Sequence, residues 1–218
     1  MDIANSIIAF DLDDTLYSER SQYAAQCLRH VAEHFNLGAD VLKAMLHSRN
    51  PYDALTKQGG QISIDDFKQI YRSTRLQPMQ LRPDATQLLH TLHRDYPSTP
   101  LFLITDGDST RQRAKITALG LESFFAPDHI IISEEIGWDK HSPMPFIHAM
   151  ARANRPLGWV YVGDNISKDF HHPNLLGWST IMLADDGTNV HSQAIEVPAE
   201  FMPQLTIKSL IQILCQQH

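Results

Sequence analysis

Residues 7–15, with the sequence IIAFDLDDT, join a short apolar run to a group of acidic side chains. The run 7–10 is continuous, as is typical of a strand buried on both faces of a parallel sheet. Asp11 and Asp13 follow where this strand would end, and residues i and i+2 of an extended chain face the same way. Two such carboxylates repel by about 4 kcal/mol at an effective dielectric near 20. A bound divalent cation such as Mg²⁺ would offset that repulsion. An isolated acidic pair can also be a solvated turn, but the carboxyl end of a buried strand favours a ligand site.

Four more apolar runs have the same character and are predicted to be strands: 101–104, 130–132, 159–162 and 180–183. Helical segments lie between them. Asp108 or Ser109 is expected to cap a helix that ends near Gly120, and Ser142 is expected to cap one over 143–153. Strand and helix therefore alternate from residue 101 onward. This alternation predicts an α/β fold with a doubly wound, mostly parallel, Rossmann-like sheet.

Residues 18–80 interrupt the alternation and contain no convincing buried strand. Helices are expected there and just after, separated by breaks at Gly38, Pro51 and Gly59: 23–35, 40–47, 65–75 and 83–96. A connection of this length is better interpreted as an inserted domain. We therefore expect a core formed by 1–17 and 81–218, with a helical insertion over 18–80. An apolar face in the tail 206–217 should dock on that core.

Composition excludes several classes of protein. The 218 residues are 43% hydrophobic and 20% charged, which is normal for a globular chain. The net charge of −7, without basic clusters, disfavours nucleic acid as a partner. An anionic substrate would need a local cation in such a chain. No basic leader precedes residue 7, and no apolar stretch approaches the roughly 20 residues of a membrane span. We therefore expect a cytoplasmic protein with no membrane partner.

Cysteine and histidine give no sign of a structural metal. Cys27 and Cys215 lie far apart and match no metal-binding spacing. The simplest interpretation is two reduced, buried thiols.

A second polar group follows the run 101–104. Thr105 offers a hydroxyl, and Asp106 with Gly107 offers turn amides that lead into a helix N-terminus, which is a natural phosphate cradle. Such turns also occur only to cap helices, so this motif alone is weak.

Lys140 and residues 163–169 (GDNISKD) complete the candidate site. A lone lysine in a loop is usually solvated, but Lys140 is the cation that an anionic substrate requires. Asp164 should lie at the same sheet edge as Asp11 and could complete a metal shell. Asp169 could accept a hydrogen bond from Lys140. Taken alone, the same carboxylates could simply cap a turn.

In their order along the chain, these motifs resemble those of the haloacid dehalogenase-like hydrolase superfamily: Asp-x-Asp-x-Thr, a strand-end Thr or Ser, a Lys, and Gly-Asp-x4-Asp. The resemblance spans residues 7–183, and the insertion 18–80 is similar to the helical cap of the family's first cap type. Residues 120–140 look like the branch that contains sugar-phosphate and nucleotide phosphatases.

The resemblance implies a phosphatase mechanism with Mg²⁺ as cofactor. Asp11 would be the nucleophile that forms an aspartyl-phosphate, and Asp13 the general acid and base. Asp11, Asp164 and the backbone carbonyl of Asp13 would hold the metal, and Thr105 and Lys140 would bind phosphoryl oxygens. Asp106 and Gly107 would line the phosphate cradle, and Asp169 would position Lys140. The cap would close over a small phosphorylated metabolite.

Two departures from the branch put the substrate in question. Asp106 stands where the branch usually has Asn, and residues 140–143 read KHSP instead of Lys-Pro-Asp-Pro. An extra carboxylate beside the phosphate could weaken anion binding or change selectivity. Residues in or near the cap that could face a sugar phosphate or nucleotide are Tyr17, Arg20, Tyr23, Arg49 and Tyr52.

Other functions remain as alternatives. A phosphomutase would use the same residues. A halide-removing enzyme needs no leaving-group acid, so Asp13 argues against it. Phospho-acceptor signalling domains are about half this length, and a catalytically inactive binding protein should have lost a motif residue. The sequence leaves monomer and homodimer open.

Overall fold

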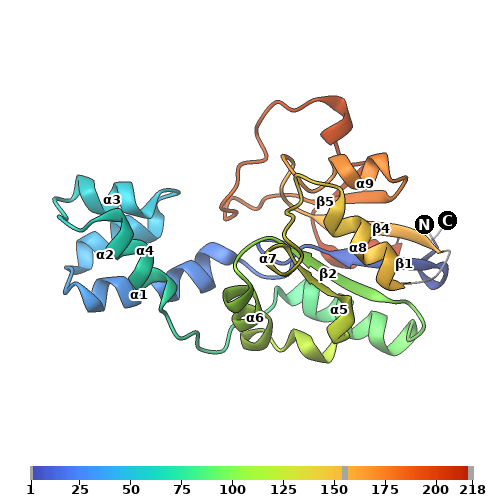
Figure 1. Ribbon diagram of the computed structural model, residues 1–218, viewed down its shortest axis with the longest axis horizontal. Coiled ribbons are helices and arrows are strands. Elements are labelled where there is room, and N and C mark those ends of the chain that lie inside the picture. The colour runs from blue at the N-terminus through green and yellow to red at the C-terminus, as the bar shows by residue number, and fades with distance from the viewer. Residues whose placement is uncertain (1, 154–156, 216–218) are drawn as a thin grey trace.

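A parallel six-stranded sheet forms the centre of the protein in the computed structural model, which describes residues 2–153 and 157–215 (Figure 1). The strand order is β3-β2-β1-β4-β5-β6, and all neighbouring strands run parallel. Their bounds are β1 Ser6–Phe10, β2 Leu101–Thr105, β3 Ile130–Ile132, β4 Gly158–Gly163, β5 Ser179–Leu183 and β6 Leu205–Ile207. The predicted α/β fold and its five strands are confirmed.

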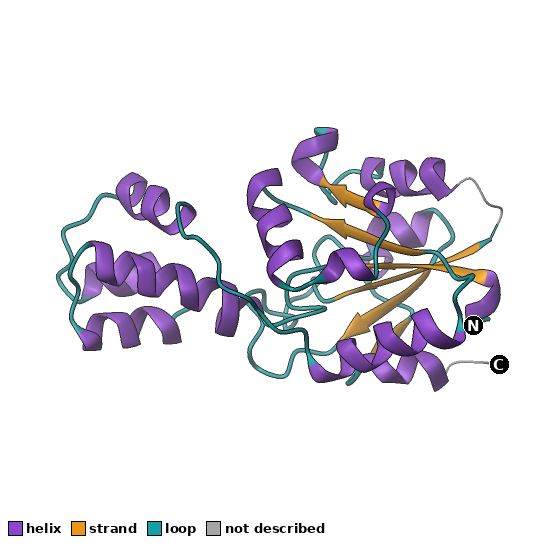
Figure 2. Cartoon of the chain, turned by 90° about the horizontal axis from the view of Figure 1, so that it is seen from below, coloured by secondary structure: helices purple, strands orange, loops and turns teal. Residues whose placement is uncertain are grey.

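Helices cover both faces of the sheet (Figure 2). Side chains alternate between faces along a strand, so Ile8 and Phe10 of β1 join one apolar cluster while Ile7 and Ala9 join the other. The first cluster includes residues of α5 (Pro83–Asp95) and α6 (Ser109–Ala118). The second includes residues of α8 (Met144–Ala153), and α9 (His171–Leu175) packs near β5. Burial on both faces is the reason that the strands have continuous apolar sequences.

Short elements complete the core. The helix α7 (Ser133–Ile136) follows β3 directly. Of the two expected caps for α6, Asp108 takes the position, and its side chain accepts a hydrogen bond from the backbone N–H of Arg111 at 2.9 Å. Single turns of 3-10 helix are found at Ile3–Asn5, Leu121–Ser123, Pro127–His129 and Ala199–Phe201.

The C-terminal tail docks on the core, as expected, but in a form that was not predicted. It forms the strand β6 and then a 3-10 helix, Leu210–Cys215, which buries Leu210 and Ile213. A three-residue strand with one fully buried side chain, Ile207, gives too little pattern to identify. In a 3-10 helix residues three apart share a face, so Cys215 lies off the face that buries Leu210 and Ile213. Cys215 is exposed, and the expectation of two buried thiols holds only for Cys27.

The insertion forms a helical group at one end of the molecule, apart from the sheet (Figure 1). A π-helical turn, Glu19–Ala24, leads into it. Its helices are α1 Ala25–His34, α2 Ala39–His47, α3 Pro51–Lys57 and α4 Ile64–Arg72. They enclose a separate apolar cluster that includes Leu28, Val31 and Phe67. The domain bounds 1–17, 18–80 and 81–218 stay a prediction.

The expected break between helices lies just before Pro51, since α2 ends at His47, but the helix α3 that begins at Pro51 was not predicted. Pro51 begins α3, where its missing N–H needs no partner, and the Asn50 side chain caps this helix by accepting a hydrogen bond from the N–H of Asp53 at 3.1 Å. Within residues 2–153 and 157–215, no helix has the length and apolar character to cross a membrane.

Candidate active site

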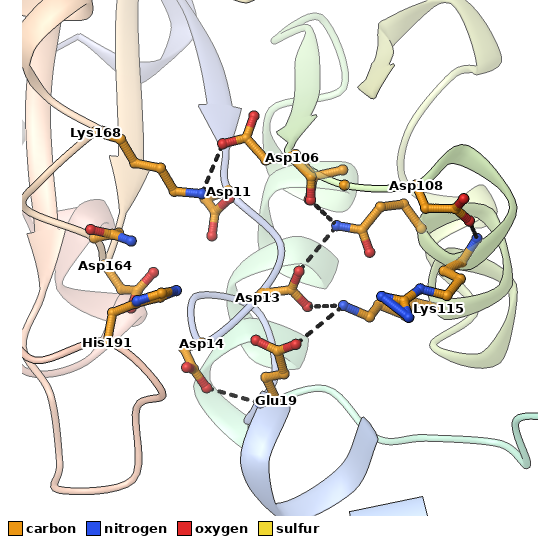
Figure 3. Close-up of a pocket in the computed structure, with 15 residues that line it drawn as sticks. Asp11, Asp13, Asp14, Glu19, Asp106, Asp108, Lys115, Asp164, Lys168 and His191 are labelled. Atoms are coloured by element: carbon orange, nitrogen blue, oxygen red, sulfur yellow. Dashed lines mark hydrogen bonds and ion pairs between the residues drawn. The ribbon is translucent and has the colours of Figure 1, made fainter. Parts of the chain in front are cut away.

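The carboxyl ends of three neighbouring strands deliver the predicted residues to one edge of the sheet. Asp11 follows β1, Thr105 ends β2 and Asp164 follows β4, and these strands are adjacent in the order β2-β1-β4. All three residues line one pocket together with Asp13 (Figure 3). The volume of this pocket is about 210 Å³. Lys140 reaches the same place from the loop before α8 and contacts Asp11. The topology thus brings together side chains that are far apart in the sequence.

Lys140 lies in the interior between two carboxylates. Its Nζ is 2.5 Å from Oδ1 of Asp11 and 2.6 Å from Oδ1 of Asp169, and its side chain is 1% exposed. Burial alone would lower the pKa of Lys140, but the charges of Asp11 and Asp169 raise it well above its ordinary value. Lys140 therefore stays charged at this site, and the expected hydrogen bond that it donates to Asp169 is present.

Asp169 also fixes the loop that carries Asp164. Its Oδ2 accepts hydrogen bonds from the backbone N–H groups of Asp164 at 3.1 Å and Asn165 at 2.8 Å. The approach is so close that a Cβ on Gly163 would lie 2.5 Å from that oxygen. Glycine at position 163 is needed for this hydrogen bonding, which orients Asp164 toward the pocket.

Three buried carboxylates form a group that could hold a metal ion. Oxygen atoms of Asp11, Asp164 and Asp169 lie within 4.8 Å of one another. Burial raises the pKa of Asp11 to about 7, against the influence of Lys140. Burial, with the charge of Asp11, also raises the pKa of Asp164 well above its ordinary value. A divalent cation would stabilise these carboxylates in the charged form, so the residues fit an oxygen-binding metal. Asp11 and Asp164 line the pocket whereas Asp169 does not, so Asp11 and Asp164 are the better placed ligands.

The carboxylate of Asp13 is held by a different set of groups. Oδ1 accepts hydrogen bonds from the hydroxyl of Tyr17 and, at 2.8 Å, from Nζ of Lys115. Oδ2 accepts one from Gln112 at 3.0 Å. Lys115 is 6% exposed and also lies 3.5 Å from Glu19. Burial would raise the pKa of Asp13, but the Lys115 ammonium lowers it below its ordinary value.

Gln112 links Asp13 to the predicted phosphate cradle. Its Nε2 lies 2.7 Å from Oγ1 of Thr105 and 2.7 Å from the carbonyl oxygen of Asp106, both of which accept hydrogen bonds from it. The cradle continues at Gly107, whose φ of 138° is a conformation that favours glycine. One side chain on α6 therefore sets the relative positions of two predicted site residues.

Sequence reasoning did not identify Gln112, Lys115 or Glu19. A signal was present for the first two. On α6 they lie on the same side as Ile116 and Leu119, which are buried in the core. Two polar residues on the core side of a helix require buried partners, and these partners are the site residues. Glu19 gave no comparable signal.

Asp106, the departure from the related branch, carries a compensated charge. Its Oδ2 accepts a hydrogen bond from Nζ of Lys168 at 2.8 Å, and its Oδ1 accepts one from the backbone N–H of Lys140 at 3.1 Å. Although burial acts in the opposite direction, Lys140 and Lys168 lower the pKa of Asp106. Lys168 was not among the predicted residues. The extra carboxylate is therefore an ion-pair partner in the pocket wall.

The other departure, at residues 141 and 142, serves the local structure. Oγ of Ser142 accepts a hydrogen bond from the N–H of Met144 at the start of α8, at 3.2 Å. The carbonyl oxygen of His141 lies 2.8 Å from a ring nitrogen of His172 on α9.

A loop after β5 reaches the side of the pocket that Asp164 lines. Nδ2 of Asn189 donates to Oδ2 of Asp164 at 2.8 Å, and the N–H of Val190 donates to Oδ2 of Asp14 at 2.6 Å. Asn189 is buried and His191 lines the pocket. No motif in the sequence marks this loop.

Of the five cap-region candidates, three lie near the site. Tyr17 donates to Asp13, and Nη2 of Arg20 donates to the carbonyl oxygen of Asn189 at 3.3 Å. Tyr23 is buried next to α6.

The other two candidates lie elsewhere. Tyr52 packs against Phe67 within the cap, and its hydroxyl donates to the carbonyl oxygen of Ile62 at 2.9 Å. Arg49 is exposed and does not line the pocket.

Comparison with known proteins finds a family match over most of the chain. Residues 8–182 match the family described as haloacid dehalogenase-like hydrolase. A curated relative, the glyceraldehyde 3-phosphate phosphatase of Methanopyrus kandleri, is 28% identical over 199 residues, which cover 81% of this chain and 82% of that protein. The N-acylneuraminate-9-phosphatase of Rattus norvegicus is 35% identical over 101 residues, which cover 46% of this chain and only 39% of that protein.

Solved structures share the fold over nearly the whole chain. The HAD-hydrolase YfnB from Bacillus subtilis, described as bound to magnesium, has a TM-score of 0.68 and 18% identity, with coverage of 96% of this chain and 97% of that chain. A predicted phosphoglycolate phosphatase from Haemophilus somnus has a TM-score of 0.66 and 20% identity, with 97% coverage of both chains. At these identities the likeness shows the fold alone.

Proposed function

The chain belongs to the haloacid dehalogenase-like hydrolases, and on that basis we propose that it is a Mg²⁺-dependent phosphatase that forms an aspartyl-phosphate on Asp11. Its substrate would be a small phosphorylated metabolite, such as a sugar phosphate or a nucleotide. The names of the curated relatives, which are phosphatases of a triose phosphate and of an acylated sugar acid, support this class.

One observation carries the proposal. The carboxylate of Asp11 lines an open pocket, and the same carboxylate contacts a buried, charged lysine at 2.5 Å. A carboxylate can attack the phosphorus of a phosphomonoester in line, form an acyl phosphate and release the alcohol. Lys140 and the hydroxyl of Thr105 would bind the phosphoryl oxygens. Since phosphoryl transfer depends mainly on positioning and charge stabilisation, a preorganised lysine is the contribution that the reaction requires.

Asp13 is the candidate acid and base. In the first half of the reaction it would donate a proton to the leaving oxygen, and in the second half it would take one from the attacking water. Lys115 and Tyr17 hold its carboxylate in a defined orientation. The charged form that Lys115 favours is the form that the second half requires.

The metal would be held by Asp11, Asp164 and the backbone carbonyl of Asp13. When bound, it would neutralise charge on the nucleophile and on the phosphoryl group. Asp169 would act through its hydrogen bonds to Lys140 and to the loop that carries Asp164.

Substitution of Asp11 by Asn tests the proposal. Asp11→Asn should abolish hydrolysis of an aryl phosphate and leave the thermal unfolding transition cooperative. Acid-quenched wild-type protein should carry a phosphoryl group that hydroxylamine releases, and Asp11→Asn should carry none. Asp65→Asn, a change of the same kind at an exposed cap position, should keep full activity. Retention of a tenth of the wild-type rate by Asp11→Asn would contradict the assignment. Phosphate transfer to a second sugar hydroxyl, in place of free phosphate, would indicate a phosphomutase.

A further inference from the structure

The pocket contains an arginine whose charge no carboxylate neutralises within the described residues. Lys115 pairs with Asp13 and Glu19, and Lys168 pairs with Asp106. Arg111 lines the same pocket and makes no ion pair with the residues described. Its Nε is buried and has no hydrogen-bond partner there. A buried donor without a partner costs about 1–3 kcal/mol, so the described residues leave Arg111 incompletely satisfied.

Arg111 is held in place by its surroundings. It lies in the first turn of α6, where its N–H donates to Asp108 at 2.9 Å. Its guanidinium carbon lies 5.9 Å from the centre of the Tyr23 ring, and Tyr23 is the buried residue of the turn that leads to the helical insertion. The cation–π contact orients the group without neutralising its charge. Arg111 is therefore a preorganised cation on the side of the pocket where the core meets the cap segment.

The chemistry of this position favours a carboxylate. Guanidinium groups bind planar carboxylates through two parallel hydrogen bonds. Most other charged side chains around the pocket are acidic, so a second dianionic phosphate would meet more repulsion than a single carboxylate. The cavity, at about 210 Å³, is smaller than the roughly 300–1,000 Å³ of sites for larger ligands, which suits a substrate of about three or four carbons.

We propose that Arg111 binds the carboxylate of a small phosphorylated hydroxy acid whose phosphate lies against Asp11. This inference rests on the proposed function for the position of the phosphate. It makes Arg111 the residue that distinguishes phosphorylated acids from neutral sugar phosphates.

A matched pair of ligands tests the inference: 3-phosphoglycerate and glycerol 3-phosphate differ only by a carboxylate in place of a hydroxymethyl group. Dissociation constants are measured by calorimetry in the Asp11→Asn protein with Mg²⁺, so that no turnover is needed. We expect 3-phosphoglycerate to bind about tenfold to hundredfold more tightly, as a charge-assisted hydrogen-bonded pair allows. Adding Arg111→Met should reduce the ratio to within about threefold by weakening 3-phosphoglycerate alone. Arg111→Lys, which keeps the charge and loses the planar fork, should give an intermediate ratio.

Arg113→Met is the matched control. Arg113 lies on the same helix but pairs with Glu135 at 2.8 Å and does not line this pocket, so its loss should leave the ratio unchanged. Equal affinities for the two ligands, or equal weakening of both by Arg111→Met, would overturn the inference. If Arg111→Met fails to fold, an unchanged ratio in Arg111→Lys would overturn it. Failure of the wild type to hydrolyse any phosphomonoester would contradict the proposed function separately, because the binding ratio does not depend on hydrolysis.

Discussion

Two lysine–carboxylate clusters border the pocket, and they differ in which parts of the chain they connect. The Lys140 cluster (Lys140, Asp11 and Asp169) lies within the core, and its side chains are 1%, 7% and 0% exposed. The three side chains of the Lys115 cluster (Lys115, Asp13 and Glu19) lie together in the pocket (Figure 3). They are 6%, 22% and 22% exposed. This cluster joins α6 to the turn that leads into the cap. The first cluster is therefore fixed by the sheet, whereas the second depends on where the cap segment lies.

This difference assigns different tasks to the two clusters. A buried cluster between strand ends has few ways to rearrange, which suits the proposed nucleophile and metal. The Lys115 cluster would change if the helical insertion moved relative to the core, which would suit the proposed acid and base, since that group must meet each new leaving group. Replacing the lysine of each cluster should therefore change activity and stability by different amounts.

Metal removal should have the largest effect, because it acts on the carboxylates of the Lys140 cluster and Asp164. Excess chelator should abolish phosphatase activity, and Mg²⁺ added above the chelator concentration should restore it. The measurement is the steady-state rate with an aryl phosphate. Thermal unfolding followed in parallel should show a transition at lower temperature without metal, since a ligand that binds only the native state stabilises it. Undiminished turnover in chelator would rule out the metal role.

Lys140→Met should reduce kcat/KM by about 10²–10³-fold, as expected when a preorganised group that stabilises charge is lost. It should also lower the free energy of unfolding by about 3–5 kcal/mol, because Asp169 would be buried without its charged partner. Urea denaturation measures the second effect. Lys57→Met serves as the control, since that side chain is 72% exposed in a pair within one helix. A stability change no larger than that of the control would contradict the picture of a rigid buried cluster.

Lys115→Met should have a smaller effect than Lys140→Met on both the catalytic rate and the free energy of unfolding. Without Lys115 the carboxylate of Asp13 keeps hydrogen bonds from Tyr17 and Gln112. We expect kcat to fall by about tenfold to hundredfold, below the full contribution of a general acid and base. Because Lys115 favours the charged form of Asp13, its loss should slow hydrolysis of the aspartyl-phosphate, a step that is the same for every substrate, so kcat should fall for an aryl phosphate as well as for substrates with poor leaving groups. The variant should therefore accumulate more phosphoenzyme in acid-quenched samples than the wild type. A lowered kcat without that accumulation would argue that Lys115 acts on folding and not on Asp13.

The same comparison shows what the sequence could predict. Asp11, Thr105, Lys140, Asp164 and Asp169 each lie just beyond or between buried strands, and parallel topology brings such positions to one edge. The positions of the apolar strands in the sequence were therefore enough to predict that these side chains lie close together.

The partners of Asp13 and Asp164 could not be found in this way. Lys115 and Glu19 meet only after the cap segment packs on α6, and Asn189 comes from a loop without regular structure. Such contacts depend on tertiary packing, and among these partners only Lys115, at helical spacing on the buried side of α6, left a signal in the sequence. The strand β6 was missed because only one of its three residues is buried, whereas all three residues of the equally short edge strand β3 are buried and form a continuous apolar run.

The Asp106–Lys168 pair should show the smallest effect. Lys168→Met leaves the Asp106 carboxylate without its partner in the pocket wall, so the KM for a phosphomonoester should rise. Because the two side chains are 20% and 15% exposed, the expected increase is about fivefold or less, which corresponds to an ion pair worth up to about 1 kcal/mol. Asp106→Asn combined with Lys168→Met should return KM close to the wild-type value, since the uncompensated charge is then absent. A double variant as impaired as Lys168→Met would show instead that Lys168 binds the substrate directly.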